Sequence, residues 1–198
     1  VSLFDRGRRR QLMSLRVSPT KIPGVLLLEP QVHQDARGRF FEAWRADAYA
    51  AAGLPSVFVQ DNVSHSTRNT LRGLHLQQPS PQGKLVQALS GEIFDVAVDL
   101  RVGSPTFVQW EGFSLSESNH LQLYLPAGIA HGFCVVSSTA LCAYKCTDYY
   151  RRDAELGVLW NDPDLGIRWP VSSPLLSAKD ARAVRLTEVP PERLPRFT

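Results

Sequence analysis

A two-residue alternation between Leu85 and Arg101 limits the possible folds of this chain more than any other feature. Within this stretch, one face of the chain carries Phe94, Val96, Val98 and Leu100, and the other carries Ile93, Asp95, Ala97 and Asp99. Alternation with a period of two is typical of a β-strand, and Ser90-Gly91 is typical of a turn between two strands. The stretch therefore predicts two consecutive strands.

Shorter apolar runs repeat this signal along the chain. Leu121, Leu123 and Leu125 alternate before Pro126, and residues 133–136 and 140–147 supply two further runs. Many short strands separated by Gly and Pro are typical of an antiparallel sandwich or barrel. We therefore expect a mainly β fold.

Two short helices are expected beside the strands. The first covers residues 42–52, which are rich in alanine and are followed by Gly53 and Pro55. The second covers residues 178–184, where Ser177 and Asp180 have the spacing of a capping box.

Composition and charge indicate one soluble domain that does not bind nucleic acid. The 198 residues are 43% hydrophobic, enough for one core, and the formal net charge of +3 is matched by residues 1–12 alone, where four arginines oppose Asp5. We expect an extension or disordered tail at 1–14, a domain at 15–185 and an extended, Pro-rich tail at 186–198. The absence of a long apolar run or a signal-peptide pattern predicts no membrane association and a cytoplasmic location.

The cysteines favour free thiols. Their number, three, is odd, and Cys142 and Cys146 lie four residues apart in an expected strand. That spacing separates them by about 13 Å, which is too far for a disulfide. Buried thiols in a reducing compartment are therefore expected.

A metal site is expected to be absent. Pro126, Gly128 and His131 match half of the pattern of metal-binding cupin barrels, whose other half is a His-x-His pair followed by a Glu. Here His75 is followed by Gln77, and no Glu comes before Glu92. The set of metal ligands is therefore incomplete.

Several segments place unusual polar chemistry between apolar neighbours. In chain order they read DARGRFFE, FVQDNVSHS, LRGLH, QGKLV, GEIFDVAVDLR, PAGIAHGF, YKCTDYY, WNDPDLGIRWP and LLSAKD. Together they cover about residues 15–182 and resemble the dTDP-4-dehydrorhamnose 3,5-epimerase family. The resemblance implies a cupin-type antiparallel jelly-roll barrel, a homodimer whose active site the partner chain completes, no cofactor and no metal. It also implies a dTDP-4-keto-6-deoxyhexose substrate.

The resemblance assigns a role to each matching position. The catalytic base falls on His75, its paired carboxylate on Asp180, the acid on Tyr144 and the cation that stabilises the enolate on Lys84. Residues of the family's sugar pocket match Arg72, Asp95 and His131. The nucleotide or diphosphate contacts match Arg37, Glu42, Gln60, Asn62 and Tyr150. One departure is Gln87, where many relatives carry Arg, and it is expected to weaken a pocket or pyrophosphate contact.

The chemistry of a 4-keto sugar explains this choice of residue types. The ketone acidifies the C–H bonds at C3 and C5, so one enolate-forming site can invert either carbon. A neutral imidazole such as that of His75 accepts a proton near neutral pH, and the carboxylate of Asp180 fixes its tautomer. Lys84 opposes the charge on the enolate oxygen, and Tyr144 returns a proton to the opposite face.

The residues leave alternatives open. A relative that inverts only C3 or C5 of a related dTDP-4-keto deoxysugar has the same catalytic groups. A metal-dependent cupin enzyme is distinguished by elemental analysis, and a non-catalytic sugar-nucleotide binder by the absence of solvent-deuterium exchange. The expected activity is that of an isomerase which converts dTDP-4-dehydro-6-deoxy-D-glucose to dTDP-4-dehydro-L-rhamnose.

Overall fold

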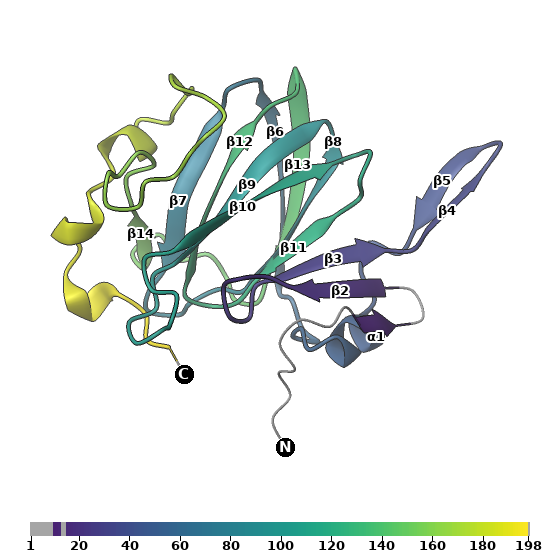
Figure 1. Ribbon diagram of the computed structural model, residues 1–198, viewed down its shortest axis with the longest axis horizontal. Helices are drawn as coiled ribbons and strands as arrows, with labels where there is room; N and C mark the ends of the chain where they lie inside the picture. The colour runs from purple at the N-terminus through teal and green to yellow at the C-terminus, as the bar shows by residue number, and fades with distance from the viewer. Residues whose placement is uncertain (1–9, 13–14, 198) are drawn as a thin grey trace.

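Two antiparallel sheets face each other in the computed structural model, which describes residues 10–12 and 15–197 (Figure 1). The first sheet has the strand order β1 (Arg10–Leu12), β2 (Leu15–Pro19), β3 (Leu26–Pro30), β11 (Gln122–Leu125), β8 (Lys84–Ser90), β13 (Thr139–Cys146), β6 (Gln60–Thr67). The second has the order β10 (Trp110–Ser116), β9 (Glu92–Asp99), β12 (Ile129–Val135), β7 (Leu71–Gln77), β14 (Glu155–Gly157). The expected cupin-type β fold is confirmed.

The alternation along β9 separates two hydrophobic cores. Ile93 and Ala97 are fully buried in the core between the two sheets, together with residues of β8, β11 and β12. Val96 and Val98 point the other way, into a second core on the outer face of the five-stranded sheet. Both faces of β9 are therefore buried, which explains why apolar residues occur on both of them.

The C-terminal part of the chain covers the outer face of the second sheet (Figure 1). It consists of loops and three 3-10 helices, η1 (Asp180–Arg182), η2 (Leu186–Glu188) and η3 (Pro191–Arg193). Leu186 and Val189 are buried against the sheet, and the Leu186 N–H donates to Asp162 Oδ2 over 2.6 Å. The expected helix at 178–184 is only η1. The expected extended tail at 186–198 instead contains η2 and η3, because its apolar residues complete the core.

A short helix and a projecting hairpin lie at the other side of the barrel (Figure 1). Helix α1 spans Ala46–Ala51, less than the expected 42–52, because Arg45 is extended with a φ of −146°. Strands β4 (Val32–Asp35) and β5 (Gly38–Phe41) form a two-stranded hairpin that extends away from both sheets, with Phe40 71% exposed.

The N-terminal tail expected at residues 1–14 is only partly within the described residues. Arg10–Leu12 form β1 and pair with β2, so this part belongs to the sheet. Residues 1–9 and 13–14 lie outside the described residues. Among the residues the structure describes, no helix has the length and apolar character needed to span a membrane.

Candidate active site

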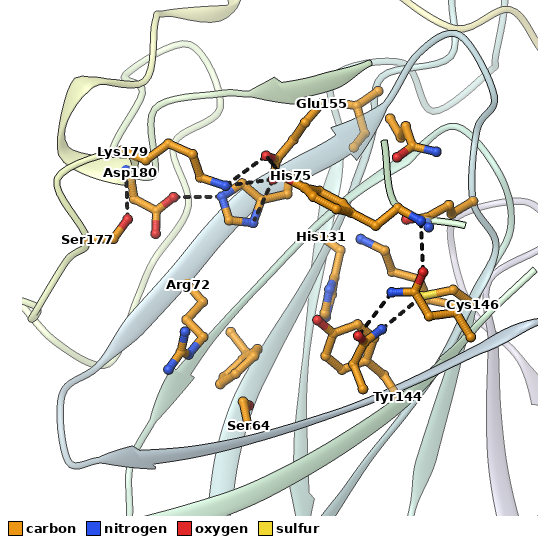
Figure 2. Close-up of a pocket in the computed structure, with 18 residues that line it drawn as sticks. Ser64, Arg72, His75, His131, Tyr144, Cys146, Glu155, Ser177, Lys179 and Asp180 are labelled. Atoms are coloured by element: carbon orange, nitrogen blue, oxygen red, sulfur yellow. Dashed lines mark hydrogen bonds and ion pairs between the residues drawn. The ribbon is translucent and has the colours of Figure 1, made fainter. Parts of the chain in front are cut away.

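A cavity of about 570 Å³ opens between the two sheets (Figure 2). Its walls come from β6, β7, β8, β12, β13 and β14, and from the loop that precedes η1. The expected site residues that line it are His75, Lys84, Tyr144, Asp180, Arg72, His131, Gln60, Asn62 and Tyr150. The structure therefore brings together side chains up to 120 positions apart, from Gln60 to Asp180.

Strand β7 places His75 in the cavity, and glycine permits its approach to β12. Gly73 has a φ of +128°, and a Cβ there would lie 2.5 Å from the Gly132 Cα. Side chains are excluded at such a contact. The LRGLH segment therefore needs its glycine for the two strands to pack, which brings the Cα of His75 opposite that of His131.

Asp180 pairs with His75. Its Oδ1 lies 2.6 Å from His75 Nε2, and the Asp180 N–H donates to Ser177 Oγ over 3.0 Å. Burial would raise the pKa of Asp180, but the hydrogen bonds from His75 and Ser177 outweigh it and hold that pKa below its ordinary value. Asp180 is therefore a carboxylate at neutral pH, beside an imidazole.

A second carboxylate lies on the other side of the His75 ring (Figure 2). Glu155 Oε1 is 4.0 Å from His75 Nδ1. The same carboxylate accepts from Lys179 Nζ at 2.7 and 2.8 Å and from the Tyr150 hydroxyl at 2.9 Å. Burial opposes the ionisation of Glu155, but the hydrogen bonds from Lys179 and Tyr150 hold its pKa below the ordinary value.

Tyr144 and Lys84 belong to the facing sheet. Tyr144 lies on β13 between Cys142 and Cys146, and Lys84 is the Cα partner of Cys146 across β8 and β13. Burial raises the pKa of Tyr144, so its phenol keeps its proton. Burial lowers the pKa of Lys84, and no hydrogen bond or ion pair within the described residues engages its ammonium group. Both polar groups are available to a bound molecule.

Asp95 does not line the cavity, contrary to expectation. It is fully buried, and its Oδ2 lies 2.9 Å from His131 Nε2. Asp95 therefore holds the His131 ring from behind, while His131 itself faces the cavity. The position in β9 explains this, because Asp95 Cα is opposite Phe133 in β12, deep in the sheet.

The three expected nucleotide contacts that line the cavity, Gln60, Asn62 and Tyr150, are linked by hydrogen bonds. Gln60 Nε2 donates to Asn62 Oδ1 over 3.0 Å, and the Tyr150 N–H donates to Gln60 Oε1 over 2.8 Å. Arg72, an expected sugar-pocket residue, lies on β7 in the other sheet, and its Nε donates to Ser66 Oγ over 3.1 Å. Together these groups present amide, phenol and guanidinium chemistry to the cavity.

Arg37, Glu42 and Gln87 lie outside the cavity. Arg37 is on the projecting hairpin, where it pairs with Asp35, and Glu42 follows this hairpin and pairs with Arg45. Gln87 Oε1 accepts from Gln122 Nε2 over 2.9 Å on the opposite face of β8 from Lys84. Gln87 does not line this cavity but lines a smaller one beside it, together with Asn62 and Tyr144, so the expected weakening of a pocket or pyrophosphate contact stays a prediction.

Three residues of this region were not expected from the sequence. Glu155 lies in a segment without a clear period, and Lys179 lies within the LLSAKD motif, where the resemblance assigned a role only to Asp180. Gln77, considered only as a replaced metal ligand, is 5% exposed and bonded to the backbone. Its Nε2 donates to Ser80 O and Tyr149 O, and its Oε1 accepts from the Arg151 N–H.

The free cysteines are confirmed, since Cys134, Cys142 and Cys146 are all unpaired and buried. Cys142 and Cys146 flank Tyr144 on the inner face of β13, where their small side chains border the cavity and the core.

Comparison with known proteins gives consistent matches. A sequence profile of the dTDP-4-dehydrorhamnose 3,5-epimerase family matches residues 19–188. A dTDP-4-dehydrorhamnose 3,5-epimerase of Pseudomonas aeruginosa is 52% identical over 168 residues, which are 84% of this chain and 93% of that protein. One of Neisseria gonorrhoeae is 51% identical over 162 residues, 81% of this chain, although this chain covers only 49% of that longer protein.

A solved structure is similar over nearly the whole chain. The dTDP-6-deoxy-D-glucose-3,5-epimerase of Legionella pneumophila, in complex with dTDP-4-keto-L-rhamnose, superposes with a TM-score of 0.90 at 47% identity. The match covers 93% of this chain and 99% of that one.

Proposed function

This chain belongs to the dTDP-4-dehydrorhamnose 3,5-epimerase family, and we propose that its cavity inverts C3 and C5 of dTDP-4-dehydro-6-deoxy-D-glucose to give dTDP-4-dehydro-L-rhamnose. The protein is an isomerase that acts on a sugar nucleotide. One observation supports the assignment of the base and the acid. The imidazole of His75, on β7, and the phenol of Tyr144, on β13, line one cavity from facing sheets.

His75 is the base in this mechanism. Asp180 accepts the Nε2–H of the ring, so the lone pair stands on Nδ1 and is free to take the proton from C3 or C5. The carboxylate also stabilises the imidazolium that forms. The negative charge then moves to the C4 oxygen of the enolate.

Lys84 and Tyr144 complete the inversion. The Lys84 ammonium opposes the enolate charge in a site of low polarity, where such a contact is strong. Tyr144 then delivers its proton to the carbon from the sheet opposite His75, which reverses the configuration. Its raised pKa suits a group that must hold its proton until the enolate forms.

The nucleotide contacts include groups that the chain's own cavity does not contain. Gln60, Asn62 and Tyr150 line the cavity, whereas Arg37 and Glu42 lie on or beside the projecting hairpin. We infer that the protein is a homodimer in which this hairpin reaches the partner's cavity. The exposed Phe40 beside Arg37 supports an interface there, because large apolar side chains favour burial.

A cytoplasmic location is also proposed. The three free thiols support it, since a reducing compartment keeps cysteines unpaired.

The test of the function is NMR of the substrate incubated with enzyme in heavy water. Deuterium is expected at both C3 and C5, and a His75→Ala variant is expected to lose both signals, by a factor of about 10² to 10⁴ in rate. Label at one carbon only would assign the protein to the single-carbon epimerases. Label at neither carbon would contradict the proposed reaction.

A further inference from the structure

Inverting two carbons with one base and one acid requires both groups to be reset between the steps. After the first inversion, His75 holds the proton taken from carbon, and Tyr144 has given its own proton away. The second inversion needs His75 deprotonated again. Proton removal from His75 is therefore a step of the double reaction, and this argument rests on the function proposed above.

The geometry of the ring identifies the nitrogen that must release the proton. Nε2 is engaged by Asp180 Oδ1 at 2.6 Å, so the proton from the substrate is carried by Nδ1. Asp180 is 4% exposed and is bound on the side away from Nδ1, so it has no direct route to this proton. The group near Nδ1 is Glu155 Oε1, at 4.0 Å.

Glu155 also connects the interior of the cavity with its exterior. Its side chain is 15% exposed, whereas that of Lys179, which it binds through both oxygens, is 58% exposed. Tyr150, whose hydroxyl donates to Glu155 Oε2, is half exposed. The carboxylate thus has one side toward the base and the other toward groups in contact with solvent (Figure 2).

Glu155 is a carboxylate at neutral pH, before it receives the proton from His75. Its hydrogen bonds from Lys179 and Tyr150 outweigh the effect of burial and keep its pKa low. A carboxylate that releases its proton readily does not retain the proton it receives.

We propose that Glu155 is the proton relay of His75, which accepts the substrate-derived proton from Nδ1 and passes it to solvent between the two inversions. Because the two atoms are 4.0 Å apart, the transfer runs through one water molecule: the Nδ1–H bond breaks, the water passes a proton on, and an O–H bond forms on Glu155. That O–H bond then breaks as water or a buffer base takes the proton. Tyr144 recovers one proton from solvent, so the enzyme returns to its starting state with no net change in protons.

The test separates the first inversion from the second in Glu155→Gln, which keeps an oxygen to accept from Tyr150 but cannot take up a proton at neutral pH. With enzyme in excess over substrate in heavy water, the products with one and two deuterium atoms are counted by mass spectrometry after rapid quenching. The first label is expected at a rate within about twofold of wild type, and the second at least about tenfold slower. Singly inverted sugar should accumulate.

A small carboxylate supplies the control for the relay itself. Sodium formate is expected to restore the second step of Glu155→Gln in a concentration-dependent manner, whereas sodium chloride at the same ionic strength should not. Glu192→Gln, an exposed position in η3, is the matched substitution and should behave as wild type.

Two outcomes would overturn the relay. A rise in KM with unchanged label ratios would make Glu155 a clamp for substrate or for Tyr150. Equal slowing of both labels without a response to formate would make it a structural support for His75. Wild-type enzyme that introduces no label at all would instead contradict the proposed function, so the two failures are distinguishable.

Discussion

At the scale of single residues, Tyr144 offers the clearest separation of roles. Tyr144→Phe removes the phenol and leaves His75, Asp180 and Lys84 in place. Proton loss from C3 and C5 should continue, because the base and the enolate cation remain, while inversion falls by about 10² to 10⁴ in rate.

The measurement for Tyr144→Phe combines deuterium exchange by NMR with product formation by chromatography. Exchange without inversion is the expected result. An equal loss of both activities would show that the phenol is needed to form the enolate and not only to protonate it.

The catalytic residues were predictable, whereas their surroundings were not. His75, Lys84, Tyr144 and Asp180 lie in motifs that a family resemblance identifies, and all four line one cavity. Glu155 carries no such signal, because its contact with His75 depends on the pairing of β14 with β7. Pairing between strands 80 positions apart is set by tertiary packing, not by local pattern.

At the scale of secondary-structure elements, Gln77 fixes the loop that carries Tyr150. Its amide makes three hydrogen bonds to the backbone of Ser80, Tyr149 and Arg151. Gln77→Leu would keep the volume but leave these groups unpaired. KM for the sugar nucleotide should rise about tenfold with a much smaller change in kcat, because Tyr150 is displaced and His75 is not.

Steady-state kinetics test the role of Gln77, with Gln77→Glu as the partner variant that keeps the acceptor oxygen. A fall in kcat with unchanged KM would assign Gln77 to the chemical step.

A buried ion pair stabilises the end of β9. The fully buried Asp99 accepts two hydrogen bonds from the Arg101 guanidinium, and further ones from Ser104 and Thr106. Asp99→Ala leaves Arg101 buried without its partner, which typically costs about 3–5 kcal/mol of unfolding free energy. Enzyme activity per folded molecule should be unchanged, because this cluster lies outside the cavity.

The contribution of Asp99 to the free energy of unfolding decreases in acid. Burial would raise the pKa of Asp99, but its hydrogen bonds hold it below the ordinary value of 3.8. The stabilisation is therefore complete above that pH and is lost as the pH falls through the folded-state pKa. Urea unfolding at about pH 7 and about pH 3 should show the gap between wild type and Asp99→Ala shrinking in acid. An equal difference in unfolding free energy between wild type and Asp99→Ala at both pH values would contradict a stabilising role of the ionised carboxylate.

At the scale of the whole molecule, the projecting hairpin predicts complementation between subunits. Arg37→Ala removes the nucleotide contact of the hairpin, and His75→Ala removes the catalytic base of the cavity. If hairpins serve the partner's cavity, each variant alone is weak or inactive, but a mixed dimer has one intact site. Random mixing in equal amounts should restore about a quarter of the wild-type sites, as expected for a two-fold symmetric dimer.

The complementation is measured as activity after the two variants are unfolded and refolded together, with each variant refolded alone as the control. Activity no higher than the mean of the two separate samples would mean that each hairpin serves its own chain or none.

The distance along the chain between His75 and Asp180, 105 residues, has a consequence for protein synthesis. Ribosomes add about 5–20 residues per second, so the base is made roughly 5–20 s before its carboxylate. Strand β6 likewise cannot pair until β13 has been made, and β7 cannot pair until β12 and β14 have been made. A nascent chain therefore holds incomplete sheets until β12, β13 and β14 are translated, and the reactive site is complete only after Asp180 has been added.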